Sequence, residues 1–277
     1  MFWRSSGISE QSPTLAQATS YLKGIVTEVI REKRAAKEKG VTSGRRDLLD
    51  QMMDKDFDDT ELFEEVVGFF LAGHETTSNT LMYTVLELCR NPDVHAKLQR
   101  EISTILPHKE SPLTLDNLKD FKYLEQVIKE AQRLHTVVGV VGRNAAKDMK
   151  IMGYDIEAGT NINIPIKHIH LDERYWPEPQ KFDPERFAEG RAAPVPGSYL
   201  PFSDGPHNCI GSKLAFIEAK VVLIQLLRQF DVELIPGQTF KYKNGVTTTL
   251  ENGVRVKLGL KNKGCDDNFG VQSVVEE

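Results

Sequence analysis

The sequence predicts a mainly helical chain with small β-sheets, an α+β class, on three observations. Apolar residues recur at helical spacing through several long segments of the first half. β-branched residues interrupted by Gly, Asp and Asn follow His135, which is typical of short strands and turns. Of the 277 residues, 40% are hydrophobic and 27% are charged, a composition with enough apolar side chains for a core.

The helical spacing predicts a series of helices before a strand-rich end that begins at Phe230. The helices are expected at Thr14–Gly40, Arg46–Met53, Thr60–Arg90, Asp93–Leu106, Tyr123–His135 and Leu214–Leu227. Thr60 is expected to begin the third helix. Within that helix Val66–Gly73 is apolar on every side, which predicts a central, buried segment. His168–Pro206 shows little periodicity, and so long an irregular segment usually has a function.

Charge and cysteine content exclude several classes of protein. Lys and Arg total 35 and Asp and Glu total 40, so the net charge of −5 gives no reason to expect a nucleic acid partner. No run of about 18 apolar residues occurs, and Met1–Pro13 lacks the apolar centre of a signal peptide. Three widely spaced cysteines make neither a disulfide framework nor a zinc cluster. We expect Cys89 to fill the core and Cys265 to lie in a loose tail over 261–277.

The remaining cysteine, Cys209, lies in the Gly- and Pro-rich segment 201–211, PFSDGPHNCIG, directly before a helix. Unpaired N–H groups at a helix N-terminus favour a thiolate, and so does a bound metal. Glycines allow the backbone to approach a large flat ligand closely. Taken alone, a cysteine of this kind is more often a buried structural residue in a turn.

Glu130 and Arg133 lie three residues apart on the predicted helix Tyr123–His135, so their side chains face each other. A pair of this kind is most often a surface ion pair that adds a few tenths of a kcal/mol. A second helical pattern, AGHETT over 72–77, places Glu75 and Thr76 in an otherwise apolar helix. It is either an acid and a hydroxyl beside a buried site or a Thr-rich face of the core.

A zinc-protease site is the other interpretation of this segment, because His74 and Glu75 begin the pattern H-E-x-x-H. The pattern requires a second histidine where Ser78 stands, so the sequence excludes that interpretation.

Together these motifs, in this order, resemble those of the cytochromes P-450. Residues 201–211 are similar to the family's haem-binding loop F-x-x-G-x-R-x-C-x-G, with matches at Phe202, Gly205, Cys209 and Gly211. His207 stands where the family usually has Arg. The resemblance implies that Cys209 is the thiolate ligand of the iron in haem b, iron protoporphyrin IX. It also implies a cytochrome P-450 fold, of which this chain would be the C-terminal half.

The resemblance also assigns the other cofactor contacts. His207 and Arg143 would bind haem propionates, with Phe202 and Gly211 against the cofactor. Gly73 would leave room for oxygen.

Residues 72–77 are similar to the family's oxygen-activation signature A-G-x-[DE]-T-[TS]. Thr76 would hydrogen-bond dioxygen and Glu75 would relay protons to it. Arg186, in the P-E-R-F motif 184–187, would join Glu130 and Arg133 in a structural network that holds the irregular segment.

Three further residues of that segment, His170, Trp176 and Pro177, also fall in the family's pattern and are interpreted as structural. The same analogy places Val137–Val141 and Thr247–Leu250 against the substrate, and β-branched residues near His135 indicate an apolar pocket.

The function implied by the resemblance is a haem-thiolate monooxygenase that inserts one oxygen atom of O2 into an apolar organic substrate. Electrons would come from NADPH through a flavoprotein reductase docked near Cys209, where Lys213, Lys220 and Arg228 supply positive charge. The full-length protein would lie at the endoplasmic reticulum membrane on its cytosolic face. Two alternatives stay open: a haem-thiolate peroxide isomerase or dehydratase, and a truncated, catalytically incompetent fragment.

The resemblance covers about residues 14–260, whereas family members are close to twice this length. We therefore expect a single partial domain over 1–277, with any membrane anchor in a missing N-terminal region. The helices Val66–Leu88 and Leu214–Leu227 would then leave apolar surface uncovered. We expect poor solubility and weak haem retention for these residues expressed alone.

Overall fold

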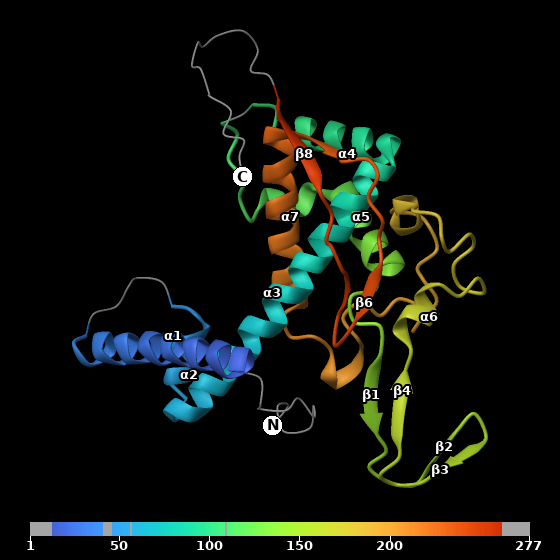
Figure 1. Ribbon diagram of the computed structural model, residues 1–277. Helices are drawn as coiled ribbons and strands as arrows, with labels where there is room; N and C mark the ends of the chain where they lie inside the picture. Colours follow the sequence, from blue (N-terminus) through green and yellow to red (C-terminus); the bar gives the residue numbers. More distant parts are fainter. Residues whose placement is uncertain (1–12, 41–45, 56, 109, 262–277) are drawn as a thin grey trace. The chain divides into compact units, whose positions relative to one another are not determined.

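The structure, a computed structural model, describes residues 13–40, 46–55, 57–108 and 110–261 (Figure 1). It divides into two units, Met1–His74 and Glu75–Glu277. The chain is mainly helical and the second unit carries small two-stranded sheets, so the predicted α+β class is confirmed. Cys265 and the chain from residue 262 onward lie outside the described residues.

The first unit contains α1 (Pro13–Glu38), α2 (Leu48–Met53) and the beginning of α3 (Asp59–Arg90). Its apolar cluster comprises Val26, Ile30, Leu49, Met52, Met53, Leu62 and Val67. Asp47 caps α2 by accepting the backbone N–H of Asp50 at 3.0 Å, and Asp50 returns a bond to the Asp47 N–H at 2.9 Å. The predicted helices at 14–40 and 46–53 are therefore present with small shifts of their ends.

The start of α3 differs from the prediction. Asp58, and not Thr60, supplies the cap, because its carboxylate accepts the backbone N–H groups of Thr60 and Glu61 at 2.8 Å each. Glu61 completes the exchange by accepting the Asp58 N–H at 2.9 Å. An aspartate that caps in this reciprocal way satisfies more unpaired N–H groups than a threonine two positions later would, so the helix begins at Asp59.

The expected burial of Val66–Gly73 is wrong for most of that segment. Val67 is buried, but Phe69, Phe70 and Leu71 are 37%, 57% and 44% exposed. A helix that is apolar all round can be buried only if side chains cover every face, and the described residues leave this part of α3 uncovered. The expectation of uncovered apolar surface is confirmed here and on α7 (Ser212–Gln229), where Leu214 and Val222 are exposed.

The second unit has its main core between three helices, α4 (Pro92–Ile105), α5 (Lys122–Leu134) and α7. α5 buries a stripe of apolar residues at helical spacing, Leu124, Val127, Ile128 and Ala131. α4 contributes Leu98 and Ile102, and α7 contributes Leu223, Ile224 and Leu227. Cys89 packs against the edge of this cluster, which confirms its predicted role in the core.

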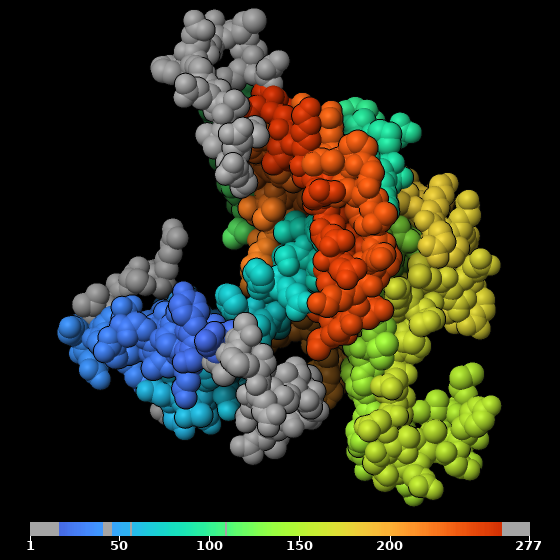
Figure 2. All heavy atoms as spheres, in the orientation of Figure 1, coloured from blue at the N-terminus to red at the C-terminus, as the bar shows by residue number. Residues whose placement is uncertain are grey.

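The sheets are antiparallel pairs. Their strands are β1 (Val141–Asn144) with β4 (Asn161–Ile164), β2 (Met149–Ile151) with β3 (Tyr154–Ile156), β5 (Phe230–Leu234) with β8 (Val256–Leu260), and β6 (Tyr242–Asn244) with β7 (Thr248–Leu250). Figure 2 shows the orange and red C-terminal strands lying over the cyan second half of α3. Leu250 packs there against the buried Tyr83 and Leu86 of α3.

Short helical turns interrupt the segment His168–Pro206, which is predicted to be irregular. They are α6 (Ile166–His170) at its start, η3 (Pro184–Phe187) and η4 (Gly205–His207), and a further turn, η2 (Asn117–Asp120), precedes α5. Between the turns the chain has little repetitive structure, as the sequence predicts. Among the described residues, no helix combines the length and apolar character needed to cross a membrane.

A pair of neighbouring substitutions on α7 tests the core. Leu223 is fully buried and Val222 is 45% exposed. We expect Leu223→Ala to lower the free energy of unfolding by about 2–5 kcal/mol, because a cavity remains in the core. Val222→Ala, the matched control, should change it by about 0.5 kcal/mol or less. Urea unfolding measures both, and equal shifts of the two midpoints would contradict this packing.

Candidate functional site

The loop before α7 presents the Cys209 side chain at the surface. The Cys209 backbone N–H donates to the Phe202 carbonyl at 2.9 Å, which closes the loop on itself. A Cβ atom at Gly211 would lie 3.8 Å from the Cys209 sulfur, so a larger side chain there would occupy space beside the thiol. The loop therefore holds an accessible sulfur with room next to it, and the interpretation of Cys209 as a buried structural residue is wrong.

The surroundings of Cys209 are apolar and open. Ile210 is 86% exposed and Leu214, one helical turn further on, is 59% exposed. Phe202 is half-buried, with its ring centroid 5.7 Å from that of Phe216. Exposed aliphatic side chains beside an accessible sulfur are suited to a large apolar ligand that carries its own metal. The residues present thus fit a haem group.

Arg143 reaches the same loop from β1. Its Nη2 donates to the Ser203 hydroxyl at 3.1 Å, although the two residues lie 60 positions apart in the chain. The register of β1 against β4 pairs Arg143 with Ile162, and the residue is half-buried. A guanidinium in this place can bind a carboxylate of a ligand that sits on the Cys209 loop. His207 lies exposed on η4.

A buried charge cluster holds the irregular segment. Glu130 and Arg133 are fully buried and form a two-pronged ion pair, with both N···O distances at 2.7 Å. Arg186, on η3, donates its Nε to Glu130 at 3.2 Å. The three predicted structural residues therefore meet. Glu130 also accepts the backbone N–H of Asp183 at 2.9 Å, so the surface-pair interpretation is wrong.

His170 connects this cluster to the cysteine loop. Its Nε2 accepts the backbone N–H of Leu200 at 2.8 Å, which identifies Nε2 as the unprotonated ring nitrogen. Nδ1 then carries the hydrogen and donates to the Thr136 hydroxyl at 2.8 Å, and that hydroxyl donates to the Arg133 carbonyl at 3.2 Å. Burial, and next the nearby Arg133 charge, lower the pKa of His170 to about 4. No motif or residue spacing in the sequence pointed to Thr136 as a member of this network.

Glu75 and Thr76 lie on α3, where Glu75 is exposed and Thr76 is half-buried. The Glu75 carboxylate accepts a hydrogen bond from the Thr247 hydroxyl at 2.5 Å. Gly73 lies at the end of the first unit, and a Cβ atom added to it would meet nothing within 4 Å. Gly73 is exposed, and its proposed role in leaving room for oxygen stays a prediction.

The expected positive patch around α7 needs correction. Lys220 is only 7% exposed, because its Nζ pairs with Glu125 at 2.8 Å and donates to the Leu118 carbonyl at 3.3 Å. Arg228 donates to the carbonyl groups of His108 and Ser111. Lys213 is exposed and keeps its predicted place near Cys209. The long aliphatic stem of Lys220 packs in the core while its ammonium group pairs with Glu125, and residue spacing in the sequence does not reveal such a contact.

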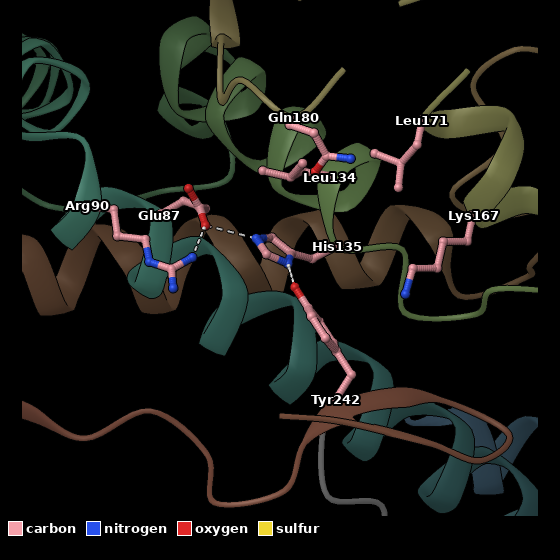
Figure 3. Close-up of a pocket in the computed structure, with 8 residues that line it drawn as sticks. All are labelled: Glu87, Arg90, Leu134, His135, Lys167, Leu171, Gln180 and Tyr242. Atoms are coloured by element: carbon pink, nitrogen blue, oxygen red, sulfur yellow. Dashed lines mark hydrogen bonds and ion pairs between the residues drawn. The ribbon is translucent and has the colours of Figure 1, made fainter. Parts of the chain in front are cut away.

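A pocket of about 370 Å³ lies beside His135 (Figure 3). Charged and polar groups line most of it, together with Leu134 and Leu171. Val137–Val141 do not line it, so the apolar pocket expected from those residues stays a prediction. Figure 3 shows a hydrogen-bonded chain across it: the Tyr242 hydroxyl lies 3.0 Å from His135 Nδ1, and His135 Nε2 lies 2.9 Å from Glu87. Burial would raise the pKa of Glu87, but hydrogen bonds and charge from His135 and Arg90 lower it.

Comparison with known proteins identifies the family. The family model described as Cytochrome P450 matches residues 4–257. The chain belongs to the cytochrome P450 family. Cytochrome P450 4d2 of Drosophila melanogaster is 39% identical over 224 residues, which is 78% of this chain and 44% of that protein. Cytochrome P450 3A13 of Mus musculus is 42% identical over 180 residues, which is 65% of this chain and 36% of that protein.

A solved cytochrome P450 structure gives the same family fold. The crystal structure of the cytochrome P450DA heme domain superposes with a TM-score of 0.79 at 29% identity, covering 88% of this chain and 55% of that one. The chain spans less than half the length of the curated cytochromes P450 above, with shares of 44% and 36%. The predicted resemblance and the predicted fold are therefore confirmed.

The buried ion pair gives a prediction about stability and cofactor binding. We expect Arg133→Gln to lower the free energy of unfolding by about 3–5 kcal/mol, because it removes the two-pronged counterion of the fully buried Glu130 and leaves only the longer contact with Arg186. Haem should then be lost on gel filtration, as judged by the ratio of Soret to protein absorbance. Arg174→Gln is the control, since Arg174 forms an exposed pair with Asp172. An Arg133→Gln variant that keeps its haem and its stability would contradict the structural role.

His170 gives a prediction about pH. Unfolded histidine binds a proton below its ordinary pKa of 6.5, whereas folded His170 stays neutral down to about 4. The unfolded state therefore gains protons first, and His170 should remove about 3 kcal/mol of stability as the pH falls through this interval.

Urea unfolding at a series of pH values measures the loss. His95 also has a pKa lowered mainly by burial and adds to the same trend. His170→Asn, which does not titrate, isolates the contribution of His170. If the pH dependence of the Asn variant matches that of the parent protein, His170 is not buried in its neutral form.

Proposed function

We propose that this chain is the haem-binding, catalytic part of a monooxygenase that inserts one oxygen atom of O2 into an apolar organic substrate. The observation that carries the proposal is the Cys209 loop, in which an exposed thiol lies among exposed aliphatic side chains. Membership of the cytochrome P450 family supports it. When bound, the haem supplies the redox chemistry that activates dioxygen.

The proposed roles of the loop residues follow from their positions. Cys209 is the thiolate ligand of the iron, and Gly211 leaves space beside its sulfur. Arg143 and His207 bind the propionates of haem b, with Arg143 steadied by its bond to Ser203. Phe202 closes the loop by accepting the Cys209 N–H.

A second group of residues, on α3, is proposed to deliver protons. Glu75 is exposed and so exchanges protons with solvent, while Thr76, the next residue on α3, is half-buried. In the proposed reaction Glu75 carries a proton inwards and the Thr76 hydroxyl positions it at the site of oxygen reduction, with Gly73 leaving room. Val137–Val141 and Thr247–Leu250 form the substrate-facing wall.

Electrons are proposed to come from NADPH through a flavoprotein reductase that docks on the face around Cys209. Lys213 is the exposed lysine at this face that suits an acidic partner. The full-length protein is proposed to work at the endoplasmic reticulum membrane, on the cytosolic side.

A carbon monoxide difference spectrum of the reduced protein tests the ligand. We expect a long-wavelength Soret band, which reports a thiolate on the iron, and we expect Cys209→Ser to abolish it. Cys89→Ala is the matched control, because Cys89 packs against the core and takes no part in the site. A band that survives in the Cys209→Ser variant would overturn the assignment.

Turnover conditions separate the proposed reaction from the alternatives. A monooxygenase needs NADPH, reductase and O2, whereas an isomerase or dehydratase of the same haem-thiolate type acts on a peroxide without them. Haem-loaded protein that converts an organic hydroperoxide without O2 and consumes no NADPH would overturn the monooxygenase proposal.

A further inference from the structure

The β6–β7 hairpin is attached to one face of α3, directly at three positions and through His135 at a fourth. The α3 residues concerned recur every fourth position, which places them on one face: they are Glu75, Asn79, Tyr83 and Glu87. Asn79 accepts the Thr249 hydroxyl at 2.7 Å, and the Tyr83 hydroxyl donates to the Thr248 carbonyl at 3.1 Å. The hairpin is therefore registered against the helix by side chains that lie about 170 positions away in the chain.

The far end of the hairpin is anchored at the pocket of Figure 3. Tyr242, on β6, contacts His135, and His135 contacts Glu87. The Tyr83 ring stacks on His135 with centroids 4.6 Å apart. This end of the hairpin is thus held by stacking and by hydrogen bonds together. Beside the turn of the hairpin, the Thr248 N–H donates to the Val137 carbonyl at 2.7 Å and adds a backbone hydrogen bond.

The near end of the hairpin reaches Glu75, through Thr247. Thr247 is 6% exposed, and its branched Cβ leaves few side-chain rotamers. A hydroxyl has one hydrogen to donate, and Thr247 gives it to the Glu75 carboxylate at 2.5 Å. This length is typical of an O–H···O⁻ bond. A glutamate side chain rotates freely in solvent, so a buried, stiff donor is what holds this carboxylate in one orientation.

We propose that Thr247 is a positioning residue, which holds the Glu75 carboxyl in one orientation on the proposed proton path, and that the anchored β6–β7 hairpin holds Thr247 in place to do so. This inference rests on the proposed monooxygenase function. The proton enters Glu75 from solvent and leaves toward Thr76, and the carboxylate then regains a proton from solvent. Thr247 itself neither gains nor loses a proton.

The experiment compares Thr247→Val with Thr247→Ser in the haem-loaded protein. Valine keeps the shape but lacks the donor, and serine keeps the donor. We expect Thr247→Val to lower the fraction of NADPH electrons recovered in product about tenfold, with the remainder appearing as hydrogen peroxide, because a misplaced group loses its contribution. Thr247→Ser, which keeps the donor, should recover most of the electron yield that Thr247→Val loses. Glu75→Gln combined with Thr247→Val should be no worse than Glu75→Gln alone.

A second measurement does not depend on turnover. Melting temperatures of the parent, Glu75→Ala, Thr247→Val and the double variant form a cycle, and we expect the two losses to overlap because both remove the same hydrogen bond. Thr104→Val is the matched control, since the exposed Thr104 hydroxyl bonds to the Arg100 carbonyl one turn back, and its effect should add to that of Glu75→Ala. Additive losses for Glu75 and Thr247 would overturn the inference.

The results separate this inference from the proposed function. A parent protein without the thiolate Soret band overturns the proposed function and this inference with it. A normal band, together with an unchanged electron yield in Thr247→Val, overturns only the role of Thr247. Overlapping melting losses with an unchanged yield have the same meaning, since they show a hydrogen bond that is merely structural.

Discussion

The organisation of the cysteine loop depends on a single buried guanidinium. Arg133 has five N–H donors and uses all five: two on Glu130, and three on the carbonyl groups of His170, Pro179 and Lys181. A charge removed from water is tolerated only when its counterion and all its hydrogens are satisfied. Because the three carbonyls belong to a segment with little repetitive structure, one side chain supplies the order that a helix or a sheet would otherwise give.

Hydrogen bonds connect Arg133 to the cysteine loop. In each of them, only one of the two groups can be the donor. The Leu200 N–H must donate, so His170 must accept at Nε2 and donate at Nδ1. The Trp176 indole N–H donates to the Ser198 carbonyl at 3.1 Å, and the Arg133 guanidinium lies 5.3 Å from the centroid of the Trp176 ring. Protonated His170 would lose its acceptor for Leu200, so burial that keeps the ring neutral also keeps the loop attached.

The sequence predicted those parts of the molecule that local rules govern. Helix periodicity placed α1 to α5 and α7, and the motifs located Glu130, Arg133, Arg186 and Cys209. Exposure of Phe70 and burial of Lys220 were not predictable, because both depend on what the rest of the chain covers. The hydrogen bond between Thr247 and Glu75 joins residues 172 positions apart, and neither residue type nor spacing signals such a contact.

Two carboxylates, Glu130 of the buried charge cluster and Glu75 of the proposed proton path, have opposite physical requirements. Glu130 is fully buried, and its oxygens are occupied by Arg133, Arg186 and a backbone N–H, which suits a structural role. A carboxyl that must pass protons needs access to solvent and unoccupied acceptor positions, and an ion pair would take both away. Glu75 remains exposed, and its one hydroxyl contact restricts rotation while using one of about four acceptor positions. A neutral donor such as Thr247 is therefore better suited than an arginine to orient a working acid.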